Sequence, residues 1–206
     1  MTSTLNKAVF LDRDGVINQK AREGDYIRTW HEIRLMPHAV EAVASLNRAG
    51  YKVIVATNQR GVATSRIRIE DLLDIHCRIQ REFERGGALI SQLYFCPHDT
   101  SQNCSCRKPQ PGMLRRAALE HDLDLRSSWM IGDSVSDVKA GENAGCRNVL
   151  LTSCTPDLTR FAKAPLIAES LHSAVPLILN HPINSHIGFV RALPVEIPRS
   201  FSREDL

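Results

Sequence analysis

The chain contains 206 residues, which is long enough for one well-buried domain. Hydrophobic residues make up 43% and charged residues 24%, a balance typical of a soluble globular protein rather than a disordered chain. The formal net charge of +3 is too small to indicate a nucleic-acid-binding protein, and no apolar run approaches the roughly 20 residues that span a bilayer. The N-terminus shows no secretory signal, so we expect a cytoplasmic protein with neither nucleic acid nor membrane among its partners.

Short apolar runs alternate with amphipathic stretches along the whole chain. The runs lack the apolar–polar alternation of half-exposed strands, so we expect strands that are covered on both faces. Between them, apolar residues recur at helical spacing. The expected strands cover residues 8–11, 51–56, 89–95, 129–131 and 148–151, and the expected helices cover about 37–49, 70–85, 111–121 and 137–143.

This alternation of strands and helices predicts an α/β fold. We expect a doubly wound, mostly parallel sheet in a three-layer arrangement, with helices on both of its faces. Ligands of such sheets bind at the carboxyl ends of the strands. Functional residues are therefore expected directly after each apolar run.

Two aspartates follow the first predicted strand. Asp12 and Asp14 are two residues apart in the segment FLDRDGV, and Gly15 after them is free to adopt an unusual backbone geometry. Two carboxylates this close repel each other unless a cation lies between them or one of them holds a proton. The pair suits a reaction that needs a metal-bound nucleophile and a proton donor. Taken alone, it is equally the pattern of a capped turn.

Polar side chains also follow the later predicted strands. Residues 57–59 (Thr-Asn-Gln) supply a hydroxyl and two amides that can donate to phosphate oxygens, or that can simply cap a helix. Residues 107–108 supply two cations that can neutralise a phosphoryl group, or that can form a solvated surface pair. Asp133, after the fourth predicted strand, offers a further carboxylate for a cation. Because these segments lie at strand ends, we expect them to meet in one phosphate-binding cleft.

Cysteines and one histidine follow the third predicted strand in the pattern C-x-H-x₅-C-x-C. Three thiolates and one imidazole form a tetrahedral, zinc-preferring set with no open position, which is typical of a structural site. Buried free thiols or disulfides are the alternatives. Zinc would fix the loop over residues 96–106, which leads directly into the two cations at 107–108. The predicted zinc ligands are Cys96, His98, Cys104 and Cys106.

In this order, the segments resemble the motifs of the haloacid dehalogenase-like (HAD) phosphatase superfamily. DRDGV is similar to the first motif, TNQ to the second, the lysine of CRKP to the third and GDSVSD to the fourth. The resemblance implies an HAD-like domain over residues 1–180, with no large cap domain, and leaves a tail of unknown role over 181–206. Together with the cysteine cluster, it points to the branch of heptose-bisphosphate and histidinol-phosphate phosphatases.

The resemblance implies magnesium-dependent hydrolysis of a phosphate monoester through an aspartyl-phosphate intermediate. It implies that Asp12 is the nucleophile and that Asp14 is the general acid and base. Magnesium would be bound by the Asp12 carboxylate, the Asp14 backbone carbonyl and Asp133. Thr57 and Lys108 would stabilise the phosphoryl oxygens.

The same resemblance favours a small phosphorylated substrate, with the 7-phosphate of D-glycero-D-manno-heptose 1,7-bisphosphate as first choice. Histidinol phosphate and other sugar phosphates are the alternatives, and a catalytically silent phosphate-binding module is an alternative of another class. A polynucleotide 3′-phosphatase shares the motif logic, but the sequence has no evident basic groove or series of stacking aromatics. The residues expected to contact the substrate are Asn58, Gln59, Arg60, Arg107 and Tyr26.

Two positions depart from the pattern of this branch and leave the substrate open. Asp25 precedes Tyr26 where the branch usually has glycine, and Ser134 stands where many heptose enzymes have lysine. The assembly state is open between a monomer and a small homo-oligomer.

Overall fold

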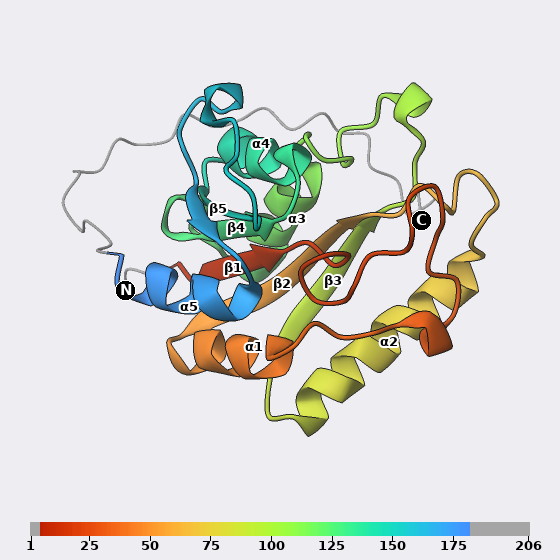
Figure 1. The fold of residues 1–206 in the computed structure, drawn as a ribbon, viewed down its shortest axis with the longest axis horizontal. Helices are drawn as coiled ribbons and strands as arrows, with labels where there is room; N and C mark the ends of the chain where they lie inside the picture. Colours follow the sequence, from red (N-terminus) through yellow and green to blue (C-terminus); the bar gives the residue numbers. More distant parts are fainter. Residues whose placement is uncertain (1–4, 182–206) are drawn as a thin grey trace.

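The computed structural model describes residues 5–181, and within them parallel strands form one sheet (Figure 1). The strand order β3-β2-β1-β4-β5-β6 means that the chain first builds outward from β1 and then crosses to its other side. The switch point of this doubly wound sheet therefore lies between β1 and β4. The strands are β1 (Lys7–Leu11), β2 (Tyr51–Asn58), β3 (Ile90–Cys96), β4 (Trp129–Gly132), β5 (Arg147–Leu151) and β6 (Leu166–Ala168).

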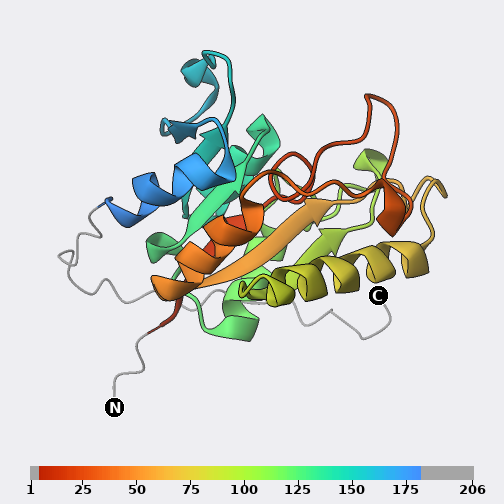
Figure 2. The same ribbon diagram turned by 60° about the horizontal axis from the view of Figure 1, so that its bottom comes forward.

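Helices cover both faces of the sheet, which gives the three layers seen in Figures 1 and 2. On one face lie α1 (Ala39–Arg48), α2 (Ile69–Arg85) and α5 (Leu171–Leu179). On the other lie α3 (Gly112–His121) and α4 (Val135–Ala144). Short 3₁₀ turns occur at η1 (Trp30–Glu32), η2 (Thr100–Gln102), η3 (Leu125–Ser127) and η4 (Leu158–Arg160).

The central strand explains why the apolar runs do not alternate with polar residues. Val9 and Leu11 of β1 pack into the core under α1, α2 and α5, whereas Ala8 and Phe10 pack into the core on the face of α3. All four side chains are fully buried. Successive residues of a strand point to opposite faces, so a strand covered on both sides needs apolar residues at every position.

The structure confirms the predicted fold class and places a strand or helix at each predicted position. The fourth helix begins earlier than expected because Ser134 caps it and forms a capping box with Asp137. The sequence analysis did not identify β6 or α5. β6 has only three residues, and α5 contains Pro176, a residue that argues against a helix interior.

The described residues also bear on two further expectations. Between the strands of residues 5–181 there is no inserted domain large enough to be a cap, because the connections hold only single helices, short turns and loops. No helix in this range has both the length and the apolar character to cross a bilayer. The tail predicted over 181–206 lies outside the described residues except for its first residue, and the division of the chain at residue 180 stays a prediction.

Candidate active site

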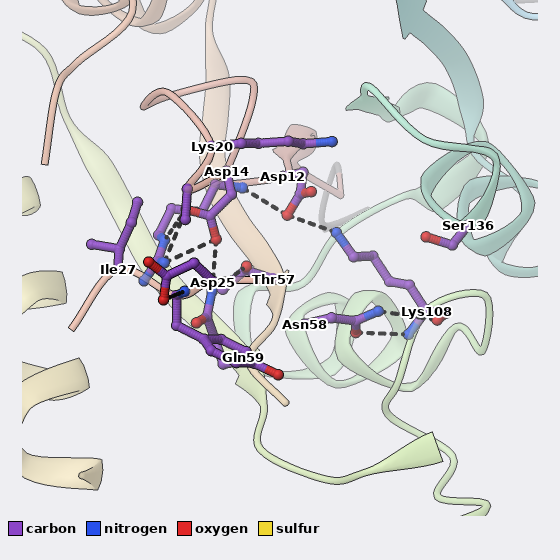
Figure 3. A pocket seen from close by; sticks show the side chains of 13 residues that line it. Asp12, Asp14, Lys20, Asp25, Ile27, Thr57, Asn58, Gln59, Lys108 and Ser136 are labelled. Atoms are coloured by element: carbon purple, nitrogen blue, oxygen red, sulfur yellow. Dashed lines mark hydrogen bonds and ion pairs between the residues drawn. The ribbon is translucent and has the colours of Figure 1, made fainter. Parts of the chain in front are cut away.

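A cleft of about 260 Å³ opens at the carboxyl ends of the central strands, beside the switch point of the sheet. Its wall combines the ends of β1 and β2, the loop after β1, the segment before α3 and the start of α4 (Figure 3). The lining residues are Asp12, Arg13, Asp14, Lys20, Ala21, Asp25, Tyr26, Ile27, Thr57, Asn58, Gln59, Lys108 and Ser136.

A tight turn at the end of β1 presents the two aspartates to this cleft. The Asp12 backbone N–H donates to the Ile131 carbonyl of β4 at 3.0 Å, and this hydrogen bond fixes the Asp12 backbone at the carboxyl edge of the sheet. Gly15 then has a φ of +92°, and a Cβ there would lie 1.8 Å from Oδ2 of Asp133. Only glycine fits this position, because it needs both a positive φ and a close approach to Asp133.

Asp12 shares a buried lysine with Asp137. The Lys108 Nζ lies 2.8 Å from Oδ1 of Asp12 and 2.5 Å from Oδ1 of Asp137, and the lysine and Asp137 side chains are almost completely buried. Burial raises the pKa of Asp12 to about 6, against the opposing effect of the Lys108 charge. Asp12 thus lies beside a fixed cation in surroundings that exclude most of the water, with its side chain 14% exposed.

Asp14 turns away from Lys108 and accepts hydrogen bonds from three side chains. Arg13 donates to both of its oxygens, with the Nη2 to Oδ2 distance at 2.9 Å. Asn18 donates to Oδ1 at 2.9 Å and Gln59 to Oδ2 at 3.0 Å. Burial opposes ionisation, but the Arg13 charge and these hydrogen bonds outweigh it and lower the pKa of Asp14.

Asp12 of the cleft belongs to a group of three carboxylates that are arranged for a cation. Oxygen atoms of Asp12, Asp133 and Asp137 all lie within 4.8 Å of one another. Oδ1 of Asp133 is buried and has no hydrogen-bond partner among the described residues, while Oδ2 lies 2.7 Å from the Lys20 ammonium. Burial raises the pKa of Asp133. A hard divalent cation that prefers oxygen ligands fits this set.

The geometry differs in one respect from the predicted metal set. Asp137 belongs to the carboxylate group that can hold a cation, and it was not among the predicted ligands. The Asp14 carboxylate lies outside that group, because Arg13 and Gln59 hold it. The role predicted for Asp14 uses its backbone carbonyl and stays a prediction.

Residues 57–59, at the end of β2, line the cleft and also hold other residues of the site in place. Thr57 is buried in the cleft wall, and its hydroxyl accepts a hydrogen bond from Gln59 at 2.9 Å. The Asn58 amide holds the backbone of Lys108 at both of its polar groups, at 3.0 and 3.1 Å (Figure 3). Both amides predicted to contact substrate therefore also hold Lys108 or Asp14 in place.

The four predicted zinc ligands meet at one point beyond β3. Nδ1 of His98 lies 3.6 Å from Sγ of Cys96 and 3.2 Å from Sγ of Cys106, and the Cys96 and Cys104 sulfurs are 3.6 Å apart. Ligands held at about 2.3 Å in a tetrahedron would have sulfurs separated by roughly 3.8 Å. The cluster therefore fits zinc in both chemistry and spacing. None of the cysteines of the described residues forms a disulfide in this structure.

The two arginines predicted to bind substrate contact the cysteine loop, and their contact with substrate stays a prediction. Nε of Arg60 pairs with Oδ1 of Asp99 at 2.5 Å, and Arg107 donates to the His98 carbonyl at 3.3 Å. Neither arginine is among the residues that line the cleft, whereas Tyr26 is. The loop is thus tied to the site by Arg60 on one side and by Lys108 on the other.

The sequence analysis did not identify several polar residues of the cleft. Arg13 and Asn18 hold Asp14, and Lys20 pairs with Asp133. The position of Arg13 between the two aspartates was a signal for its role. Asn18 and Lys20 gave no comparable signal, because their placement depends on the loop that follows Gly15.

Comparison with known proteins gives consistent matches. The HAD-hydrolase-like family pattern matches residues 105–174. The chain is 39% identical over 143 residues to the D-glycero-beta-D-manno-heptose-1,7-bisphosphate 7-phosphatase of Pseudomonas aeruginosa, covering 69% of this chain and 79% of that protein. It is 38% identical over 191 residues to the D-glycero-D-manno-heptose-1,7-bisphosphate 7-phosphatase of Thermosynechococcus vestitus, covering 84% and 96%.

A solved structure agrees with these sequence matches. The D,D-heptose 1,7-bisphosphate phosphatase of B. bronchiseptica, crystallised with magnesium and phosphate, superimposes with a TM-score of 0.75 at 31% identity. The superposition covers 84% of this chain and 98% of that one. The likeness therefore extends over most of this chain.

Proposed function

Because this chain belongs to the HAD-like heptose-1,7-bisphosphate 7-phosphatase family, we propose that it hydrolyses the 7-phosphate of D-glycero-D-manno-heptose 1,7-bisphosphate. The family places it among the phosphoric monoester hydrolases. The observation that carries the proposal is that Asp12, Asp14 and Lys108 line one cleft at the switch point of the sheet, with Asp133 in the carboxylate group of Asp12.

In the proposed reaction, a carboxylate oxygen of Asp12 attacks phosphorus and forms an acyl phosphate while the bond to the leaving oxygen breaks. Asp14 gives a proton to the leaving alkoxide and then takes one from the water that hydrolyses the intermediate. The two aspartates differ in their partners, since Asp12 pairs with Lys108 and Asp14 pairs with Arg13.

The transferred group carries negative charge on its oxygens, so cations and donors around it lower the barrier. Lys108 supplies a buried positive charge at 2.8 Å from the nucleophile, and Thr57 supplies a hydroxyl in the cleft wall. Magnesium held by Asp12 and Asp133 would add charge neutralisation at the phosphoryl oxygens. Asp137 is close enough to join this set or to hold Lys108.

We propose that zinc occupies the cysteine cluster and has a structural role. We also propose a cytoplasmic location, because a reducing compartment keeps a thiolate cluster available to zinc. Tyr26 and Asp25 line the mouth of the cleft and are proposed to face the sugar. No observation favours histidinol phosphate over a sugar phosphate, so both belong in the test.

Phosphate release from a panel of compounds tests the proposal. The panel contains heptose 1,7-bisphosphate, other sugar phosphates, histidinol phosphate and p-nitrophenyl phosphate, each with and without magnesium. We expect magnesium-dependent release, with the highest kcat/KM for the heptose bisphosphate. A higher kcat/KM for a different compound would overturn the proposed substrate assignment. Binding without release from any compound would support the silent phosphate-binding module.

A further inference from the structure

A buried arginine and a buried histidine lie behind Asp14 and have no role in the mechanism described so far. The Arg13 side chain is 1% exposed although it carries a full charge, and His76 of α2 is 5% exposed. A charged side chain is costly to bury unless its donors are matched by acceptors. What these two residues contact therefore indicates why they are there.

The guanidinium of Arg13 joins two elements. Nε and Nη2 donate to the Asp14 carboxylate, at 3.2 Å from Nε and at 2.9 and 3.0 Å from Nη2, and Nη1 lies 3.2 Å from Nε2 of His76. Arginine has donors only, so this Nε2 must be the unprotonated nitrogen that accepts. His76 is therefore neutral, with its hydrogen on Nδ1. Burial, together with the nearby Arg13 charge, lowers the pKa of His76 to about 3, which agrees with this assignment.

His76 is itself held firmly. It lies on α2, which extends over Ile69–Arg85, and its ring packs edge-on against Phe95 of β3 with centroids 5.7 Å apart. The neighbouring Ile75 and Ile79 are fully buried in the core. The direction of the Arg13 guanidinium is thus fixed by a long, well-packed helix rather than by the loop that carries it.

We infer that the Arg13–His76 pair is a positioning device for Asp14, which holds its carboxyl group in the orientation that proton transfer to the leaving oxygen requires. The inference rests on the proposed function, since it concerns the acid of that reaction. Asp14 remains 27% exposed toward the cleft, so it is held from behind and reachable from the front. In the step concerned, the Asp12 oxygen bonds to phosphorus, the bond to the leaving oxygen breaks, and the Asp14 proton goes to that oxygen.

Such a role predicts an effect that depends on the leaving group. A sugar alkoxide needs the proton, whereas nitrophenolate leaves without one. The parameter kcat/KM reports only the steps up to departure of the leaving group, so it isolates this proton transfer from the later hydrolysis of the acyl phosphate. A residue that only supports the fold would change both substrates alike.

The test compares kcat/KM for p-nitrophenyl phosphate with that for the alkyl phosphate that ranks first in the panel above. His76→Leu removes the acceptor for Arg13. We expect kcat/KM to fall about 30-fold for the alkyl phosphate, a partial loss of the roughly 10²–10⁴-fold that acid–base catalysis contributes, and less than about 3-fold for the aryl phosphate. His76→Gln keeps an acceptor oxygen and should restore most of the loss. Ile75→Val, a buried change on the same helix, should leave the ratio of the two values unchanged.

Arg13→Lys provides a second route if His76→Leu fails to fold, as judged by its thermal unfolding curve. Lysine keeps the charge but cannot reach Asp14 and His76 at once, so the same selective loss is expected. Equal losses on both substrates in a folded variant would overturn the inference and leave a structural role. No loss in either variant would overturn it as well. A wild-type protein inactive on every phosphate would instead refute the proposed function.

Discussion

The two sides of the cleft hold carboxylates that are both largely buried, with Asp12 14% and Asp14 27% exposed, but that have different charged partners. On one side, Asp12 shares Lys108 with Asp137, and burial raises its pKa to about 6. On the other side, burial also disfavours the charged form of Asp14, but the Arg13 charge and three sets of hydrogen bonds lower its pKa. The comparison teaches that the partners, rather than burial, determine which of two neighbouring carboxylates is ionised more readily.

The proposed roles require the reverse order during the reaction. The nucleophile must be ionised and the acid must hold a proton, whereas in the free protein Asp12 has the raised pKa and Asp14 the lowered one. A cation beside Asp12 favours its charged form, and a phosphoryl group beside Asp14 favours its protonated form. A bound cation and a bound phosphoryl group are therefore expected to move the two groups toward the protonation states that the reaction needs.

The largest expected effect is on the nucleophile side. Asp12→Asn removes the attacking oxygen and should lower kcat by at least about 10⁴-fold for aryl and alkyl phosphates alike. The fold should persist, because Lys108 keeps Asp137 as a partner. Phosphate release and thermal unfolding check both points. Activity near the wild-type level would refute the assignment of Asp12.

A middle-sized effect is expected at the shared lysine. Lys108→Met leaves Asp12 and Asp137 buried without their cation and should destabilise the metal-free protein by about 3–5 kcal/mol at pH 8. A carboxyl group with a raised folded pKa favours the fold below its unfolded pKa and loses that contribution as pH rises through the folded value. The deficit should therefore shrink toward pH 5 in denaturant titrations.

Lys20→Met is the matched control for this experiment. Lys20 also pairs with a carboxylate of the cleft, at 2.7 Å from Asp133, but its side chain is 52% exposed. Exposed ion pairs contribute about 0–1 kcal/mol, so we expect a small change in stability. Equal losses of stability in Lys20→Met and Lys108→Met would contradict the claim that the burial of Lys108 makes its ion pairs more important for stability.

A smaller effect on activity is expected at the cysteine loop, which is tied to the site through Arg60 and Lys108. Cys104→Ser should remove zinc from the purified protein, lower the unfolding temperature and reduce kcat/KM by about 10-fold. Metal analysis, calorimetry and kinetics measure the three effects. Cys154→Ser changes an exposed cysteine outside the cluster and should change none of them. Unchanged kinetics in a zinc-free Cys104→Ser protein would contradict a role of the cysteine loop in supporting the cleft.

Most of the sheet was predictable because its signal is local. The run over residues 8–11 is apolar at every position, which a strand buried on both faces requires. The edge strand β6 has only three residues, and Pro176 in α5 opposes a helical interpretation of its segment, so neither could be found from periodicity. Their formation depends on the sheet and on α1, against which α5 packs.

The candidate site was predictable where its residues end strands. Asp12, Thr57 and Asp133 follow apolar runs, so topology alone brings them together. The side-chain partners were not predictable in this way. Arg60 pairs with Asp99, and His76 reaches Arg13 from a helix that contributes nothing else to the cleft. Such contacts depend on the path of the loops and on side-chain rotamers, and the spacing of motifs in the sequence does not predict either.

The covalent intermediate is the central claim, and trapping it tests the claim most directly. Wild-type protein and Asp14→Asn, which lacks the base for the second step, are mixed with p-nitrophenyl phosphate, quenched and reduced with borohydride. The account predicts homoserine at position 12 in peptide mass spectra, with more of it in Asp14→Asn. Rapid phosphate release with no modified residue, or a modification elsewhere, would contradict it.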